Sequence, residues 1–253
     1  MRHLFRSLQS AAVPALLAAM LALTGCGTDN AASQACPTTN AKADVALALV
    51  ADGSVSGDQT YLAQTTEWLL EQALVNKAAL SVATFGGSDA QIDQAPCLNA
   101  STFAPSGSNE RLRKANTPRL LKAAATEISG LRHDFVSSDL VAAFRIGVSL
   151  LRSTPPGVPR RLVIVTDGVA TAGCAALPST VDPMDESLIA DLVNRCTSVL
   201  PDASGIDVIV LGVGHTGDLS SESVTFLAEL STALCHASRA KTCSIPLTRP
   251  NRL

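Results

Sequence analysis

Aromatic residues are scarce in this chain, which has one Trp, one Tyr and six Phe among its 253 residues. Proteins that bind single-stranded nucleic acid usually stack its bases on aromatic rings. Long basic segments are also missing: the longest cluster, RLRK at 111–114, stands alone, and the formal net charge is −3. Phosphate backbones are bound by clustered Lys and Arg side chains. We therefore expect no nucleic-acid partner.

Common catalytic and redox signatures are absent as well. The sequence contains no C-x-x-C, which removes the usual signature of zinc and thioredoxin-type sites. It has no G-x-S-x-G serine elbow, and His133 and His215, on predicted loops, have no evident Ser or Cys partner. We therefore predict that the protein is not an enzyme. A metal-assisted or nucleotide-dependent enzyme remains the weaker alternative.

The first 25 residues are predicted to form a leader and not part of the fold. Arg2 and Arg6 precede an apolar stretch at 11–23 that is too short to span a bilayer comfortably. The stretch runs into LTGC, which resembles the lipobox of bacterial lipoproteins. The resemblance implies cleavage before Cys26, a lipid on that cysteine, and an extracytoplasmic protein anchored to a bacterial membrane. An ordinary secretory signal or an uncleaved anchor is the alternative.

Composition divides the chain into four segments. After the signal peptide at 1–25, residues 26–43 are small and polar without periodicity, which is typical of a tether and here predicts a lipidated one. One domain is expected at 44–248, long enough to bury a substantial core, and 249–253 form a short tail.

Disulfide bonds are the expected role of the cysteines. The chain has seven, of which six follow Cys26, and an even number is typical of an exported, disulfide-stapled chain. Sequence alone does not choose among the possible pairings. Our hypothesis joins near neighbours, as Cys36–Cys97, Cys174–Cys196 and Cys235–Cys243.

Short apolar runs alternate with amphipathic segments after the tether. Runs that are apolar on both faces are typical of parallel strands covered by helices on each side, and they lie at 45–51, 79–85, 161–166 and 206–212. Helical periodicity marks the segments between them, at 61–76, 139–152, 185–200 and, more weakly, 224–234. The alternation predicts an α/β fold with a Rossmann-like, doubly wound, mostly parallel sheet flanked by helices.

Residues 86–118 break this alternation, because they are rich in Gly, Pro, Ser and Asn. They are predicted to form a long surface loop with at most one short edge strand.

Carboxylates and hydroxyls gather where two of the predicted strands end. Asp52, Ser54 and Ser56 follow the run at 45–51, and Asp167 follows the run at 161–166. In open α/β sheets, ligands bind beyond the carboxyl ends of the strands. Oxygen ligands without His or Cys suit a hard divalent cation such as Mg²⁺ or Mn²⁺. These residues are therefore candidate metal ligands.

Three loops resemble the metal-ion-dependent adhesion site of von Willebrand factor type A (VWA) domains. Asp52-Gly53-Ser54-Val55-Ser56 is similar to the D-x-S-x-S signature of the family, and Asp167-Gly168 is similar to its T-D-G turn. SSDLVAAF at 137–144 is similar to the family's T-D-L-x-x-A-L helix start, with Ser138 in place of threonine. The resemblance covers about residues 43–248 in strand and helix order.

This resemblance implies a VWA fold and a shared cation site. The cation, Mg²⁺ or Mn²⁺, would be held by Asp52, Ser54, Ser56, Ser138 and Asp167, and an acidic residue of a protein ligand would complete its shell. Serine at 138 keeps the hydroxyl ligand but lacks the methyl group that stiffens threonine.

Several alternatives remain for these residues. The insertion before the second loop leaves open whether Ser137 or Ser138 is the ligand. Ser138 is also a plausible helix N-cap, and Asp52 and Asp167 are plausible turn residues, since Asp-Gly is common in turns.

A competing motif follows the last predicted strand. Residues 212–217, GVGHTG, match G-x-G-x-x-G, but a dinucleotide site should open its βαβ unit and have an acid about 20 residues further on. The corresponding stretch, HASRAK, has no acid. We interpret these glycines as turn residues.

These observations together predict an extracytoplasmic, lipid-anchored VWA-like domain that binds a protein partner through a divalent cation. A metal-independent interaction scaffold is the main alternative, and it predicts that chelation of metals changes nothing.

Overall fold

The computed structural model describes residues 41–55, 59–99, 101–178, 186–215 and 219–247. Its seven strands are β1 (Val45–Asp52), β2 (Ala78–Phe85), β3 (Ile92–Gln94), β4 (Ser101–Thr102), β5 (Arg160–Val165), β6 (Ile206–Leu211) and β7 (Thr242–Ser244). Its helices are α2 (Gln59–Val75), α3 (Glu110–Ser129), α4 (Leu140–Leu150), α5 (Glu186–Cys196) and α6 (Ser221–Ala237).

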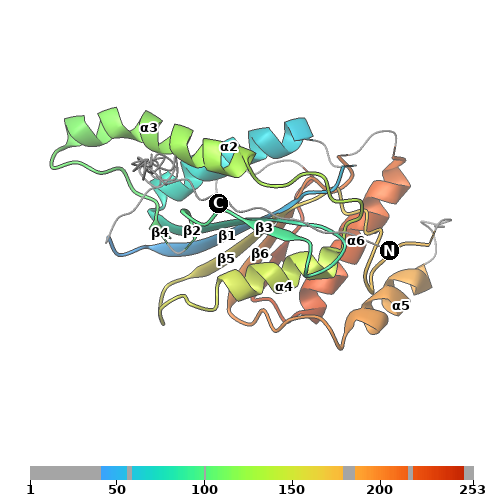
Figure 1. Ribbon diagram of the computed structural model, residues 1–253. Coiled ribbons are helices and arrows are strands. Elements are labelled where there is room, and N and C mark those ends of the chain that lie inside the picture. Colours follow the sequence, from blue (N-terminus) through green and yellow to red (C-terminus); the bar gives the residue numbers. More distant parts are fainter. Residues whose placement is uncertain (1–40, 56–58, 100, 179–185, 216–218, 248–253) are drawn as a thin grey trace, which may run out of the picture.

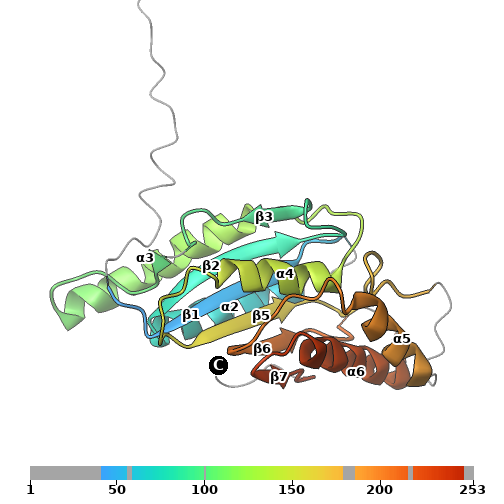
Figure 2. The same ribbon diagram turned by 90° about the horizontal axis from the view of Figure 1, so that it is seen from below.

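The strands form one sheet in the order β3-β2-β1-β5-β6-β7, with β4 also paired to β2. The central pairs are parallel, and only β3 and β4 run antiparallel to their neighbour β2. Helices α2 and α3 cover one face of the sheet, and α4, α5 and α6 cover the other (Figures 1 and 2). This confirms the predicted doubly wound, mostly parallel α/β fold.

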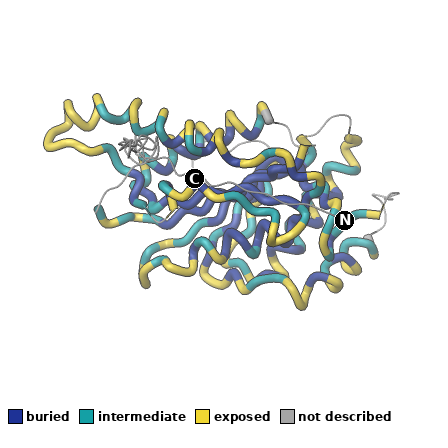
Figure 3. The backbone as a smooth tube through the Cα atoms, in the orientation of Figure 1, coloured by how far each residue is buried: buried dark blue, intermediate teal, exposed yellow. Residues whose placement is uncertain are grey.

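Two apolar layers sandwich the sheet, because its central strands are apolar on both faces. In β1, Ala46, Ala48 and Val50 join the core under α4, α5 and α6, while the alternate residues Leu47 and Leu49 join the core under α2 and α3. The alternation follows from the two-residue period of a strand. Figure 3 shows the strands as the buried centre of the molecule, with exposed residues on the outer sides of the helices.

The predicted strands and helices are confirmed to within a few residues at most of their ends. Helix α4 is the most buried of the helices, as its continuous apolar stripe indicated, with eight buried residues from Leu140 to Val148. Trp68, on α2, packs against the core under α2 and α3 as a partly buried side chain.

The prediction for residues 86–118 was wrong in part. This segment contains two short strands, β3 and β4, and it also begins α3, which continues through Pro118 to Ser129. Helix α3 gave a weak signal because it buries only Ala124 and Ile128, and because proline normally interrupts a helix. Asn109 could have predicted the start of α3, because Asn is a favoured N-cap residue. Its side chain accepts a hydrogen bond from the Leu112 N–H.

Two of the three predicted disulfides are confirmed. Cys174 is bonded to Cys196, and Cys235 is bonded to Cys243. Cys97 is also disulfide-bonded, but its predicted partner Cys36 lies outside the described residues. Within the described part of the chain, none of the helices is long and apolar enough to cross a membrane.

Candidate metal centre

Three loops meet at the carboxyl ends of the central strands. Asp52 is the last residue of β1, Asp167 follows β5 by two positions, and Ser138 precedes α4. Because β1 and β5 are adjacent and parallel, their ends lie at the same edge of the sheet. Asp52, Ser138 and Asp167 are 5%, 3% and 8% exposed. The structure therefore brings both predicted carboxylates into one buried region with one of the three predicted hydroxyls.

The Asp52 carboxylate accepts one hydrogen bond from each of the three loops. Its Oδ2 accepts from the Ser138 hydroxyl at 2.7 Å and from the Thr166 hydroxyl at 3.0 Å. Its Oδ1 accepts from the backbone N–H of Ser54 at 2.9 Å, which closes a tight turn. All three donors are neutral. Among the described residues, the buried carboxylate of Asp52 is therefore held by hydrogen bonds from neutral groups and not by a basic side chain.

The second loop brings only one of the two candidate serines into contact with Asp52. Ser138 contacts Asp52, whereas the Ser137 side chain lies over Gly87. The N-cap interpretation of Ser138 was wrong: the cap of α4 is Asp139, whose Oδ1 accepts from the Val141 N–H at 2.9 Å. Because the cap is one position later, the Ser138 hydroxyl is directed at Asp52 and not at the helix.

The third loop is locked to the second by three hydrogen bonds. The backbone N–H groups of Thr171 and Ala172 donate to the Ser138 carbonyl at 2.9 and 3.0 Å. The Ser138 N–H in turn donates to Thr171 Oγ1 at 2.9 Å. Asp167 itself accepts from the Val169 N–H at 2.8 Å. Ser138 and Asp167 are therefore positioned by the same loop.

The first loop is held by the segment that precedes Ser138. Gly53 and Val55 exchange backbone hydrogen bonds with Phe135 at 3.0 Å, and Ser54 forms an isolated bridge with it. A Cβ at Gly53 would lie 2.7 Å from the Arg132 carbonyl oxygen and 2.8 Å from the Phe135 ring. Only glycine allows the two loops to approach so closely.

Helix α4 begins under a buried acid. The Asp139 side chain is 6% exposed, and Arg145 approaches it to 3.7 Å while pairing more closely with Asp89 at 2.7 Å. Burial raises the pKa of the Asp139 carboxyl, and the N–H groups of Ala142 and Val141 together with Arg145 oppose that rise. Burial therefore disfavours the ionised form of this N-cap residue, which is adjacent in sequence to the candidate ligand Ser138.

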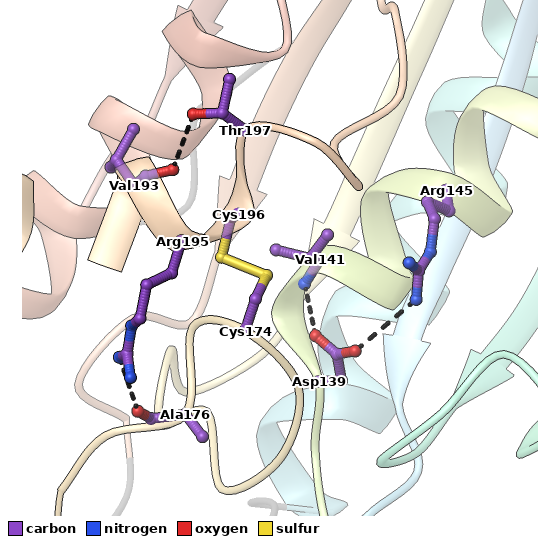
Figure 4. The surroundings of a disulfide bond; sticks show 9 residues. All are labelled: Asp139, Val141, Arg145, Cys174, Ala176, Val193, Arg195, Cys196 and Thr197. Atoms are coloured by element: carbon purple, nitrogen blue, oxygen red, sulfur yellow. Dashed lines mark hydrogen bonds and ion pairs between the residues drawn. A yellow bond between two sulfur atoms is a disulfide. The ribbon is translucent and has the colours of Figure 1, made fainter. Parts of the chain in front are cut away.

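A disulfide fastens the third loop to helix α5 (Figure 4). Cys174 lies on this loop and Cys196 ends α5. The neighbouring Gly173 has a φ of +77°, and a Cβ there would come within 2.4 Å of the Asp139 carboxylate oxygens. The loop therefore closes over the N-cap of α4, and the disulfide keeps it there.

The residues present fit a hard cation better than a soft one. Among the described residues, no group of three or more His, Cys, Asp or Glu side chains could hold a metal ion, so a typical zinc site is not indicated and an ion here would need hydroxyl or water ligands beside the aspartates. Two buried carboxylates with the hydroxyls of Ser138 and Thr166 form an all-oxygen set, which suits Mg²⁺ or Mn²⁺. A buried carboxylate is also costly without a positive charge nearby.

Two predicted residues are not tested by this geometry. Ser56, the last hydroxyl of the D-x-S-x-S signature, lies outside the described residues, and so does Cys26 with its predicted lipid. Ser54 is described and 2% exposed, next to Asp52. Its predicted role and that of Ser56 stay predictions.

The glycine motif after β6 supports the turn at Asp167. Gly212 and Gly214 have positive φ angles of +91° and +76°, and the Gly214 N–H donates to the Asp167 carbonyl at 2.8 Å. His215 stacks on Tyr61 with ring centroids 4.0 Å apart. These contacts agree with the interpretation of the glycines as turn residues.

Sequence reasoning missed two residues of the centre. Thr166 and Thr171 had no part in the predicted ligand set, yet Thr166 binds Asp52 and Thr171 binds the Ser138 N–H. A signal for Thr166 was available: it follows Ile164 by two positions, so it extends the α4-facing row of β5 toward the site.

Comparisons with known proteins show similarity only at the level of the fold. No protein-family profile matches the chain, and no curated protein matches it. Among solved structures, the pilus adhesin SpaC from Lactobacillus rhamnosus GG, in its open conformation, is 13% identical with a TM-score of 0.45, and the similarity covers 84% of this chain and 29% of the adhesin. This chain therefore spans less than a third of that protein.

Two further structures are similar over most of their own length. The conserved hypothetical protein BatB from Bacteroides thetaiotaomicron is 14% identical, with a TM-score of 0.43 and coverage of 80% of this chain and 90% of BatB. The VWA domain of SpRpn10 is 15% identical, with a TM-score of 0.37 and coverage of 79% and 86%. The strand order and helix layers of the chain itself show a Rossmann-like, doubly wound α/β fold.

Proposed function

We propose that this protein is a lipid-anchored, extracytoplasmic binding module that captures a protein partner through a divalent cation. The observation that carries the proposal is the burial of Asp52, which is 5% exposed and hydrogen-bonded only to neutral groups among the described residues. A cation bound beside it would compensate its charge. Asp167 and the hydroxyls of Ser138, Ser54 and Ser56 would supply further oxygen ligands.

The cation would keep a position open for the partner. Mg²⁺ is usually bound by one or two carboxylates and retains several waters. If Asp52 and Asp167 neutralise it only partly, an incoming Glu or Asp side chain would take the place of one of those waters. Coordination of a partner's carboxylate would be a binding step, and we propose a binding module and not an enzyme.

Exposed apolar residues flank the centre and suggest what surrounds that acid on the partner. Val55 and Val136 are 67% and 84% exposed, and they lie on the two adjacent loops joined by the Val55 N–H and the Phe135 carbonyl. Apolar side chains around a polar centre are typical of recognition surfaces. The proposed partner segment carries an acidic residue with apolar neighbours.

The compartment is proposed from the leader and the cysteines. The LTGC motif, which resembles a lipobox, supports a proposed lipid on Cys26, and the bonds Cys174–Cys196 and Cys235–Cys243 suit an oxidising environment.

A second candidate function is a scaffold that binds its partner without metal. One observation favours it: the Ser138 and Thr166 hydroxyls already find an acceptor in Asp52. A network whose hydrogen bonds are satisfied in this way does not depend on an ion for its hydrogen bonding.

Calorimetric titration of Mg²⁺, then Mn²⁺, into the metal-stripped protein separates the two candidates. The variant Asp52→Asn removes the buried charge, and Asp134→Asn is the matched control because Asp134 is an exposed residue paired with Arg132. We expect one saturable site in the parent and in Asp134→Asn, and none in Asp52→Asn. No heat in the folded parent would sink the metal mechanism and favour the scaffold.

A further inference from the structure

A cavity of about 520 Å³ lies on the face of the sheet opposite α4. It opens between α2 and α3 and reaches down to β1 and β2, the two strands under those helices in Figure 1. Its walls are mainly aliphatic, and they include Leu49, Leu62, Leu70, Val82, Leu121 and Ile128. Cavities of this size and apolar character are typical of small-molecule sites.

Two polar atoms at this cavity lack hydrogen-bond partners. Thr84 is 1% exposed, and its Oγ1 has no partner among the described residues. The Nδ1 of His133 is also buried without one. Both residues line the cavity. A buried polar atom left unpaired costs free energy, and such atoms are uncommon in native proteins. Both atoms are covered in the unliganded cavity, so a bound hydroxyl would pair with them by displacing the side chains that cover them.

The charges around the cavity narrow the chemistry of that molecule. Glu67, Glu71 and Lys122 are charged lining residues, and all three are exposed at the outer part of α2 and α3. Burial lowers the pKa of His133 despite the nearby Asp93, which keeps the imidazole neutral near pH 7. The buried polar groups are thus neutral, and an ionised head group beside them would be buried without a counter-charge.

We propose that this cavity binds an uncharged amphiphile with an apolar body and one hydroxyl group. The aliphatic walls hold the body, and the hydroxyl bonds with Thr84 Oγ1 and His133 Nδ1. A hydroxyl is both donor and acceptor, so it satisfies Thr84 together with either tautomer of the neutral imidazole. The site is separate from the metal centre, because Thr84 belongs to the apolar layer under α2 and α3, while Asp52 bonds with Ser138 at the start of α4.

The test uses 1-octanol as the probe, with octanoate and octylamine as charged analogues of the same length. Binding to the purified protein is followed by NMR of methyl groups and by thermal unfolding. We expect saturable shifts confined to methyl groups such as those of Leu62, Val82 and Leu121, and a higher melting temperature with 1-octanol. Equal or tighter binding of either charged analogue would overturn the proposed neutral head group.

Two variants test the location. Ala125 is an exposed lining residue on α3, and Ala115 is exposed on the same helix away from the cavity. We expect Ala125→Trp to abolish the shifts by filling the cavity and Ala115→Trp to bind 1-octanol like the parent. Unchanged binding by Ala125→Trp, or no saturable shift in the parent, would overturn the proposal.

One isosteric variant tests the hydrogen bond. Thr84→Val keeps the shape of the side chain and removes the hydroxyl, so we expect affinity for 1-octanol to fall about fivefold, the effect of one hydrogen bond. The same variant should raise the melting temperature of the unliganded protein, because it removes an unpaired buried polar atom. An unchanged affinity would contradict the assignment of Thr84 as head-group partner.

Discussion

The hydroxyl of Ser138 donates a 2.7 Å hydrogen bond to Oδ2 of Asp52, across 86 positions of the chain. Neither side chain has a role in holding its own element together, because α4 is capped by Asp139 and β1 is held by its two neighbouring strands. The contact therefore joins two loops at the edge of the sheet, where a ligand would bind.

Replacing Ser138 should impair cation binding more than replacing its neighbour. We expect Ser138→Ala to weaken Mg²⁺ binding tenfold or more, a loss of about 1.4 kcal/mol, because one oxygen ligand disappears. Ser137→Ala is the matched control, since Ser137 lies over Gly87 and not against Asp52, and it should change the affinity less than about twofold. Calorimetry on the three proteins compares them, and equal effects of the two variants would contradict the assignment.

Glycine at position 53 should be required for the approach of the first two loops. We expect Gly53→Ala to lower the free energy of unfolding by about 1–3 kcal/mol, as overpacking typically does, because its Cβ would meet a backbone carbonyl at 2.7 Å. Gly130→Ala is the control: Gly130 has a right-handed φ of −81°, and its nearest such contact is at 3.4 Å. Chemical denaturation measures both, and a Gly53→Ala variant as stable as Gly130→Ala would refute the close packing.

Loss of the disulfide on the third loop should affect both stability and metal binding. Removing Cys174–Cys196, with a sequence separation of 22, should cost about 3 kcal/mol by the loop-entropy relation. It should also weaken Mg²⁺ binding, because this loop positions Ser138 and Asp167. Removing Cys235–Cys243, which joins α6 to the edge strand β7, should lower stability and leave Mg²⁺ affinity unchanged. Denaturation and calorimetry on the two double Cys→Ser variants measure stability and Mg²⁺ affinity. Equal Mg²⁺ affinities of the two variants would contradict the prediction that the third loop depends on its disulfide.

The buried cap of α4 should give stability a dependence on pH. Burial raises the pKa of Asp139 above its usual value of 3.8, so the folded protein holds this proton more tightly than the unfolded chain. The contribution of Asp139 to the free energy of unfolding is therefore fully present below pH 3.8 and is lost as pH rises through the raised folded pKa. Asp139→Asn keeps a good N-cap and does not ionise, so its stability relative to the parent should increase as pH rises through this range.

Asp202 offers a control of opposite sign for the same measurement. Hydrogen bonds from Ser204, with a smaller effect from Arg239, lower the pKa of this exposed carboxyl. Its contribution is present at higher pH and is lost as pH falls. Asp202→Asn should therefore lose stability relative to the parent as pH rises. Parallel trends in the two variants, followed by denaturation across pH, would contradict both assignments.

The layered fold was predictable because its strands are buried on both faces. The apolar runs at 45–51 and 161–166 have no polar alternation, and this pattern places helices on both sides of a parallel sheet. Helix α4 was predictable for the same reason, since almost every one of its side chains contacts the core. Helix α3 was not, because it contacts the sheet through few residues and contains Pro118.

The sequence predicted where the two aspartates of the candidate site lie. It did not predict which hydrogen bonds the neighbouring side chains make. Aspartates after two parallel strands must lie at one edge, so Asp52 and Asp167 were placed correctly from sequence. The choice of Ser138 over Ser137 depends on which residue caps α4, and that is decided by hydrogen bonds of Asp139 with the helix. The unpaired Thr84 hydroxyl had no sequence signal, because it depends on how α2 and α3 pack together.

The direction of β1 places the start of the folded domain and the candidate metal centre at opposite ends of the sheet. The chain enters this strand at Val45 and reaches the candidate centre seven residues later at Asp52, so the entry point and the centre lie about 23 Å apart on opposite ends of the sheet. A protein held to a membrane through its N-terminal segment, as we propose, would therefore be free to turn its cation-binding loops away from the lipid surface. Large soluble partners, or molecules on an opposing surface, would reach the open coordination position without competing with the bilayer for space.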